Sequence, residues 1–194
     1  RLMSAQSLEK MFGVNKRKQP IIVTMHPETF NLEQSTKNVR NVIAALTDFD
    51  NQVIFTASNA DAKGREINQI IKKEVNKRDE WLFFNNLSTR AYYSAMAISS
   101  LMVGNSSSGI IEAASFNLRV INVGTRQRGR VRGSNVYDVS TKTSEIKRKI
   151  SDALVSSCNK KNDDFENPYY NGGASKIIVQ RTLEAIKSGI SPVK

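Results

Sequence analysis

Short runs of apolar residues alternate along the chain with longer stretches in which apolar residues recur every three or four positions. The short runs are rich in β-branched and aromatic residues, the pattern of strands that are buried on both faces of a parallel sheet. This pattern predicts strands over residues 21–25, 53–55, 81–84, 101–103, 120–123 and 136–139.

The longer stretches have the spacing of amphipathic helices. They predict helices over residues 2–12, 32–46, 63–77, 88–97, 107–116, 144–155 and 174–188. Gly13 is expected to end the first of these helices and Ser88 to cap the fourth. Because strand and helix alternate at least five times, the expected fold class is α/β: a Rossmann-like parallel sheet with helices on both faces.

Composition narrows the class of protein further. A chain of 194 residues with 39% apolar and 24% charged residues is long and apolar enough for one well-packed domain. A single cysteine, Cys158, excludes an intrachain disulfide, and a single histidine, His26, excludes a pair of histidine metal ligands. The same two counts lead us to expect no metal. Because the sequence shows neither an apolar run of about 20 residues nor a signal-peptide pattern, we expect a cytoplasmic protein with no membrane partner.

The net charge of +11 raises the possibility of a nucleic-acid partner. The sequence, however, resembles neither a helix-turn-helix, nor a zinc finger, nor an RNA-binding strand with stacking aromatic residues. A small anionic ligand explains a local excess of arginine equally well. We therefore expect no nucleic-acid partner, and a non-enzymatic basic RNA-binding module stays as an alternative function.

The strongest local signal is the segment Gly104-Asn105-Ser106-Ser107-Ser108-Gly109, between a buried strand and a helix. Small residues allow a ligand to approach the backbone, and the amides at a helix start attract anions. Ser106 and Ser107 add hydroxyl donors, so the segment predicts a phosphate cradle. The structural alternative is a tight turn capped by a serine. The segment matches neither the Walker loop nor the Gly-x-Gly-x-x-Gly fingerprint, which weakens nucleoside-triphosphate and NAD interpretations.

Two kinds of charged residue accompany this turn. Glu112, about one turn into the following helix, suits ribose hydroxyl groups; its structural alternative is a carboxylate that complements the helix dipole. Four arginines follow the fifth strand at positions 126, 128, 130 and 132. Arginine suits phosphate, and we expect one or two of the four to reach the cleft while the others form a solvated loop.

Three further polar segments follow the first three strands. They are His26 after the first, Asn59-Ala60-Asp61 after the second and Asn86-Leu87 after the third. Because the carboxyl ends of parallel strands meet at one edge of the sheet, these segments converge with the Gly-Ser turn and the arginine loop. The sequence therefore predicts a nucleotide-diphosphate site at this edge.

Four of these segments occur in an order that resembles a known family. They are residues 23–28, 59–61, 104–113 and 122–130. Together they resemble the C-terminal half of UDP-N-acetylglucosamine 2-epimerases, most closely the hydrolysing branch that serves sialic and legionaminic acid synthesis. The resemblance implies one half of a two-domain fold like that of B-type glycosyltransferases. Residues 20–194 would form the UDP-binding domain, and residues 1–19 a helix and linker from a missing N-terminal half.

The resemblance also implies roles for individual residues. His26, Ser106 and Ser107 would contact the diphosphate, and His26 is the one candidate catalytic residue. Asn59, Leu87, Glu112 and Arg126 would complete the UDP site, with Leu87 against the uracil and Glu112 on the ribose. No cofactor is implied.

The reaction implied is hydrolysis of UDP-N-acetylglucosamine to N-acetylmannosamine and UDP. Most of the acid–base carboxylates would belong to the missing half, so the chain alone is expected to be inactive, and the full-length protein to be a homo-oligomer. The donor half of a B-type glycosyltransferase is the alternative enzyme.

Overall fold

The computed structural model describes residues 1–28, 32–59, 63–157, 164–170 and 172–189. Of the positions singled out above, Ala60, Asp61 and Cys158 lie outside the described residues.

Six parallel strands form one sheet in the order β3-β2-β1-β4-β5-β6. They are β1 (Ile21–Thr24), β2 (Val53–Thr56), β3 (Trp81–Phe84), β4 (Leu101–Gly104), β5 (Val120–Val123) and β6 (Val136–Val139). The six predicted strands are all present, with ends shifted by at most one residue. Since the strand order reverses between β1 and β4, the sheet has a Rossmann-like switch point at its centre.

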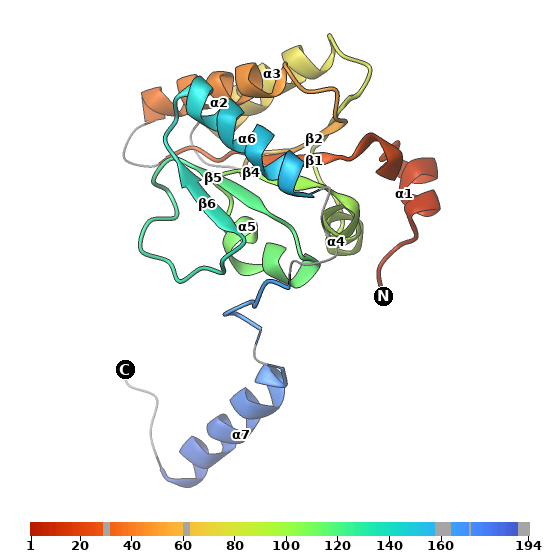
Figure 1. Cartoon of the computed structure of the whole chain (residues 1–194). Coiled ribbons are helices and arrows are strands. Elements are labelled where there is room, and N and C mark those ends of the chain that lie inside the picture. The colour runs from red at the N-terminus through yellow and green to blue at the C-terminus, as the bar shows by residue number, and fades with distance from the viewer. Residues whose placement is uncertain (29–31, 60–62, 158–163, 171, 190–194) are drawn as a thin grey trace.

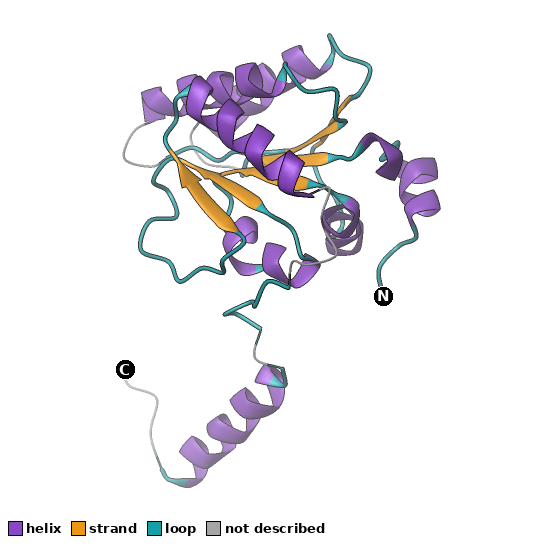
Figure 2. Ribbon diagram, viewed as in Figure 1, coloured by secondary structure: helices purple, strands orange, loops and turns teal. Residues whose placement is uncertain are grey.

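Helices cover both faces of this sheet (Figures 1 and 2). The described α-helices are α1 (Ala5–Phe12), α2 (Leu32–Leu46), α3 (Gly64–Val75), α4 (Thr89–Ile98), α5 (Ser107–Ile111), α6 (Thr143–Ser157) and α7 (Ala174–Lys187), of which α7 does not lie against the sheet. Two 3-10 turns, η1 (Lys16–Lys18) and η2 (Ala113–Phe116), complete the described elements. Ser88 caps α4 and Gly13 ends α1 in the left-handed conformation, as the sequence predicts. The single helix expected over residues 107–116 is wrong, because the chain breaks at Glu112 into α5 and η2.

Alternate residues of each strand enter two separate hydrophobic cores. In β1, Ile21 and Val23 join the core beneath α2, α3 and α6, whereas Ile22 faces the core that includes residues of α1 and α4. Successive side chains of a strand point to opposite faces, so alternation between two cores is the geometry of a sheet covered on both faces. This packing fixes the strands rigidly and leaves the loops at their ends to carry the chemistry.

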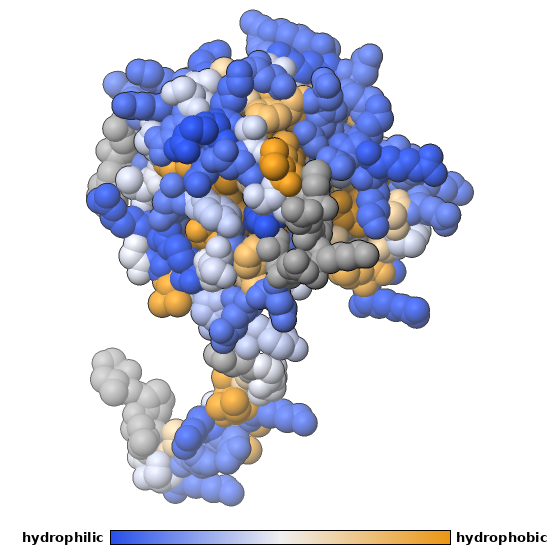
Figure 3. Space-filling view, viewed as in Figure 1, coloured by the Kyte–Doolittle hydropathy of each residue, from blue (hydrophilic) through white to orange (hydrophobic). Residues whose placement is uncertain are grey.

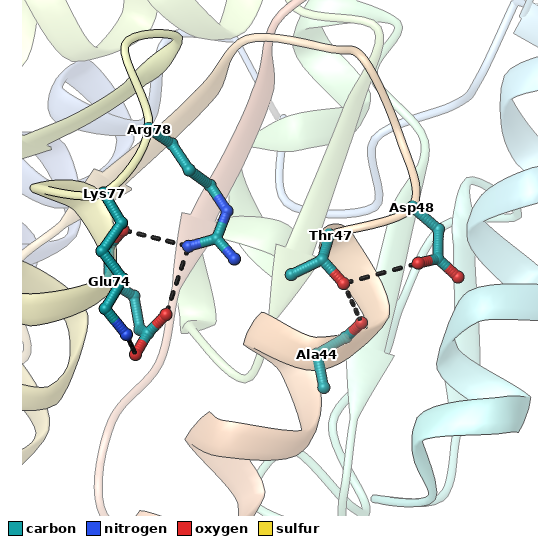
Figure 4. A network of polar contacts seen from close by, with 6 residues as sticks. All are labelled: Ala44, Thr47, Asp48, Glu74, Lys77 and Arg78. Atoms are coloured by element: carbon teal, nitrogen blue, oxygen red, sulfur yellow. Dashed lines mark hydrogen bonds and ion pairs between the residues drawn. The ribbon is translucent and has the colours of Figure 1, made fainter.

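Polar contacts close the C-terminal ends of α2 and α3, near the amino ends of the strands (Figure 4). Arg78 Nη1 donates to the backbone carbonyl and to the carboxylate of Glu74, both at 3.1 Å. Lys77 also bonds Glu74 and, with Arg78, holds the pKa of that carboxyl below its ordinary value. At the end of α2, Thr47 donates to the carbonyl of Ala44 at 2.9 Å. These contacts give hydrogen-bond partners to carbonyl groups of the last helical turn, where the helix itself supplies too few amides.

The two terminal helices differ in how they join the domain. Helix α1 packs against α4, with Leu8 buried and the amide of Met3 donating to Ser94 Oγ. Helix α7 lies away from the sheet, and none of its residues is buried (Figure 1). Its large apolar side chains are 51–67% exposed, and hydrophobic and hydrophilic side chains lie next to each other on it (Figure 3).

Two features are absent from the described part of the chain. None of its helices combines the length and apolarity needed to cross a membrane. The same residues include no group of three histidine, cysteine or acidic side chains that could bind a metal.

Candidate functional site

The predicted site residues all follow the carboxyl ends of strands, at the edge of the sheet opposite the contacts of Figure 4. His26 follows β1, Asn59 follows β2 and Leu87 follows β3. Ser106, Ser107 and Glu112 follow β4, and Arg126 follows β5. The parallel pairing of these strands brings the five loops to one edge.

Asn105 joins the first of these loops to the Gly-Ser turn. Its Oδ1 accepts from the backbone amide of His26 at 2.7 Å, and its Nδ2 donates to the His26 carbonyl at 2.9 Å. The side chain of Asn105 is buried, so these two bonds form away from water. The backbone of His26 is thereby fixed through both of its polar groups.

The carbonyl of Asn105 joins the arginine loop to the same turn. It accepts from Arg126 Nη1 at 3.2 Å and from Gln127 Nε2 at 2.8 Å. Gln127 is buried, and within the described part of the chain its Oε1 has no hydrogen-bond partner. Arg126 is thus held beside the Gly-Ser turn, for which the sequence predicts a phosphate cradle.

The His26 ring is oriented by the second loop. The backbone amide of Asn59 donates to His26 Nδ1 at 3.1 Å. Since a nitrogen that accepts a hydrogen bond carries no hydrogen, the neutral ring carries its hydrogen on Nε2. The structure therefore brings His26 and Asn59 together, and it sets the tautomer that donates from Nε2.

Gly104 allows β4 to enter the turn. Its φ is +142°, and a Cβ at this position would lie 2.0 Å from the carbonyl oxygen of Thr24. Only glycine fits this close approach of the two central strands. The amide of Asn105 then donates to the same Thr24 carbonyl at 3.1 Å.

Ser106 caps the short helix α5. Its Oγ accepts from the amide of Ser108 at 3.3 Å and from Ser108 Oγ at 3.0 Å. The serine-capped turn offered as the structural alternative is therefore present. The amide of Ser107, at the first helical position, has no acceptor within the helix, and such amides bind anions.

A hollow of about 250 Å³ lies beside this turn. Leu87 lines it, together with Asn86, Phe84, Tyr92 and Ser106. Tyr92 Oη and Ser108 Oγ are 2.8 Å apart, and burial raises the pKa of the tyrosine, so it stays a neutral phenol. The hollow combines a flat aromatic side chain with amide groups, which suits a planar polar ring.

Glu112 does not line this hollow, but its charge acts on Tyr92, which does. Its Oε1 accepts from Tyr93 Oη at 3.1 Å, and burial raises the pKa of its carboxyl while the tyrosine bond lowers it. Glu112 ends α5 instead of lying in its first turn, so the interpretation that it complements the positive end of the helix dipole is wrong. Capping does not account for it either, because its side chain makes no cap bond to η2.

The four arginines have different surroundings. Arg126 reaches Asn105, as described, whereas Arg128 and Arg130 are exposed. Arg132 bonds the carbonyls of Gln127 and Arg130 in its own loop and the carboxylate of Asp138 in β6. It therefore holds the arginine loop against β6.

Sequence reasoning missed the residues that hold the site together. Asn105, Gln127 and Tyr93 were not singled out, although each contacts a predicted site residue or its loop. The asparagine directly before the serines was the one available signal, because a buried strand end rarely tolerates an amide without partners.

Residues 2–183 match the sequence family described as UDP-N-acetylglucosamine 2-epimerase. The chain belongs to this family. Among curated 2-epimerases, it is 36% identical over 138 residues to the GDP/UDP-N,N′-diacetylbacillosamine 2-epimerase (hydrolyzing) of Campylobacter jejuni, covering 70% of this chain and 36% of that protein. The UDP-N,N′-diacetylbacillosamine 2-epimerase (hydrolyzing) of Legionella pneumophila is 33% identical over 169 residues, covering 87% and 44%.

Solved structures of 2-epimerases share the fold. The S. aureus MnaA–UDP co-structure gives a TM-score of 0.69 at 17% identity, over 95% of this chain and 48% of that one. The UDP-GlcNAc 2-epimerase of Neisseria meningitidis bound to UDP-GlcNAc gives 0.65 at 17% identity, over 92% and 48%. These similarities confirm the predicted fold class, one half of a B-type glycosyltransferase-like architecture. The chain spans half or less of the length of these four 2-epimerases.

Proposed function

We propose that this chain is the UDP-binding half of a hydrolysing UDP-sugar 2-epimerase. The observation that carries the proposal is the polar rim in which Asn105 joins the loops of His26 and Arg126 beside the Gly-Ser turn. Family membership and the hydrolysing relatives support it. The uracil would occupy the hollow at Leu87, the ribose would meet Glu112, and the diphosphate would lie against His26, Asn59, Ser106, Ser107 and Arg126.

This half has a defined share of the chemistry. In the proposed reaction, loss of the C2 proton and departure of UDP give a 2-acetamidoglucal, to which water adds. The bond from the anomeric carbon to UDP breaks, so negative charge develops on the diphosphate. Arg126, the helix amides and the Nε2 hydrogen of His26 would stabilise that charge. Removal of the proton from C2, a carbon that bears only an acetamido group to activate it, needs positioned bases, and we assign these to an N-terminal half.

The substrate class follows from the relatives. We propose a UDP-activated hexosamine with an acetamido group at C2, either N-acetylglucosamine or N,N′-diacetylbacillosamine, which the relatives' names include. The site residues named above would touch the UDP portion, which the two sugars share. The polysialic acid biosynthesis protein P7 of Escherichia coli, 32% identical over 189 residues, supports a role in supplying sialic acid-like sugars. A cytoplasmic location, a division between residues 19 and 20, and a homo-oligomer remain parts of this proposal.

Calorimetry with UDP and an assay of UDP release test the proposal. We expect the 194-residue chain to bind UDP and to release none from UDP-N-acetylglucosamine, because the assigned bases lie in the other half. Absence of UDP binding would overturn the nucleotide site, and release at an enzyme-like rate would overturn the division of labour.

The longer protein separates hydrolysis from glycosyl transfer. Incubation with UDP-N-acetylglucosamine or its diacetylbacillosamine counterpart, with no acceptor added, should give UDP and the free 2-epimerised sugar. No turnover until an acceptor is supplied would favour the glycosyltransferase alternative.

A further inference from the structure

We propose that Asn105 is the positioning residue of the diphosphate site, because it sets His26 and Arg126 relative to each other and to the Gly-Ser turn. The inference rests on the proposed function, since it concerns the residues assigned there to the diphosphate. Asn105 itself is given no contact with the ligand. It acts through the three loops that it joins.

Every polar group of Asn105 is used within the protein. The side chain exchanges two bonds with the backbone of His26, the amide bonds the Thr24 carbonyl, and the carbonyl accepts from Arg126 and Gln127. The residue is 1% exposed. A buried side chain with this many satisfied bonds has one orientation, because any other would leave polar groups without partners.

Asparagine is the side chain that this position requires. The backbone of His26 presents one donor and one acceptor, and only an amide of this length returns one acceptor and one donor. Aspartate would keep the bond to the His26 amide, lose the donor to the His26 carbonyl and place negative charge beside the proposed phosphates. Alanine would remove both bonds.

Asn105 holds His26 through its side chain and Arg126 through its backbone carbonyl. The His26 ring is fixed by Asn105 through its backbone and by the Asn59 amide through Nδ1. The guanidinium of Arg126 has five donors, so one bond to the Asn105 carbonyl orients the group without exhausting it. Loss of the Asn105 side chain should therefore release the backbone of His26, whereas the Asn105 carbonyl that accepts from Arg126 belongs to the backbone and stays in place.

The test uses Asn105→Ala in the full chain, with Asn135→Ala as the matched control. Asn135 is equally buried and donates from Nδ2 to the Leu118 carbonyl at 2.8 Å, but it lies before β6, at the opposite edge of the sheet. Thermal melting establishes that each variant folds. Calorimetry then measures the affinity for UDP and for inorganic pyrophosphate.

We expect Asn105→Ala to weaken pyrophosphate and UDP at least about tenfold, the loss of one favourable hydrogen bond to a charged group. Asn135→Ala should leave both affinities unchanged even if it lowers the melting temperature. Because His26 is the one histidine of the chain, its ring gives a single set of ¹⁵N signals without any ligand. Those signals should shift in Asn105→Ala and stay in place in Asn135→Ala.

If Asn105→Ala does not fold, Asn105→Asp is the second variant, since it keeps the volume and one of the two bonds. It should shift the ligand-free His26 signals and weaken pyrophosphate. Equal pyrophosphate affinity in wild type and in the folded Asn105 variant would overturn this inference alone. A wild-type chain that binds neither UDP nor pyrophosphate would overturn the proposed function and this inference with it.

Discussion

The charged carboxylate of Glu112 destabilises the fold, because the side chain is partly buried. Burial raises the pKa of its carboxyl above the ordinary 4.5, and Tyr93 is the one hydrogen-bond partner of that carboxyl among the residues that the structure describes. The protonated carboxyl carries no such penalty, so the fold has its full stability below the unfolded pKa of this group. That stability is partly lost as the pH rises through the folded pKa. A ligand that donates hydroxyl hydrogens to the carboxylate would offset this cost.

We expect Glu112→Gln to raise the melting temperature at pH 7 and to lose that advantage as the pH falls through the folded pKa, until none remains below the ordinary 4.5. Glu74→Gln should do the reverse, because Lys77 and Arg78 hold the pKa of Glu74 below its ordinary value. It should lower the melting temperature at pH 7, by an amount that shrinks in acid. Thermal melts of both variants across this range test the pair, and parallel pH profiles would contradict it.

Ligand affinity separates the proposed roles of Glu112 and Arg126. Glu112→Gln should weaken UDP by roughly 10- to 100-fold, the value of a hydrogen bond to a charged group, and should leave pyrophosphate nearly unaffected. Arg126→Ala should weaken both ligands, by a factor that falls at high salt. Calorimetry with the two ligands decides the matter. Unchanged UDP affinity in Glu112→Gln would remove the ribose assignment and leave the phosphate site standing.

Single residues at strand ends were predictable from the sequence, whereas the residues that orient them were not. His26, Asn59 and Arg126 could be placed on one edge because parallel strands end together. The bonds of Asn105 to His26 join residues 79 positions apart, and no local pattern encodes such a pair. Glu112 was misplaced within its helix because the end of α5 depends on packing.

Among the elements, the turn between β4 and α5 tolerates little change. Gly104→Ala would place a Cβ against the Thr24 carbonyl and also demand an unfavourable φ. Gly129 is the matched control, since its φ is +83° but a Cβ added there would meet no atom within 4 Å. We expect Gly129→Ala to cost about 1–2 kcal/mol, the penalty of a left-handed residue, and Gly104→Ala to cost clearly more. Urea unfolding measures both, and equal losses would contradict the close approach.

The elements themselves were predictable where burial repeats regularly. Strands buried on both faces produce continuous apolar runs, as in β1, β4 and β5, and the partly buried β3 and β6 were found as well. The break at Glu112 was missed because Ile110, Ala113 and Ala114 are buried on both sides of it, so helical periodicity continues through the change from α5 to η2. Hydrophobic spacing does not separate an α-helix from a 3-10 turn over so few residues.

For the molecule as a whole, α7 is the element that the sheet domain does not need. Its apolar side chains are more than half exposed. We expect a chain that ends at residue 170 to melt within about 2 °C of the full chain, because the removed helix buries nothing. Light scattering should show less self-association for the shorter chain. A drop of about 10 °C or more would mean that α7 supports the domain.

The position of α7 marks the limit of what the sequence predicts at this scale. Its helical pattern was clear, and residues 174–187 form the helix. An amphipathic pattern indicates that one face of a helix prefers burial, but it does not predict which surface covers that face.

The pairing of β1 with β4 has a consequence for the kinetics of folding. Ile21 pairs with Leu101, so the centre of the sheet closes only after about half of the chain has been made or has collapsed. The bond between Asn105 and His26 depends on that late closure. Any species with β1, β2 and β3 alone therefore lacks the proposed diphosphate site. We expect this closure to follow the rate-limiting step of folding, so saturating UDP should slow unfolding and leave the refolding rate unchanged.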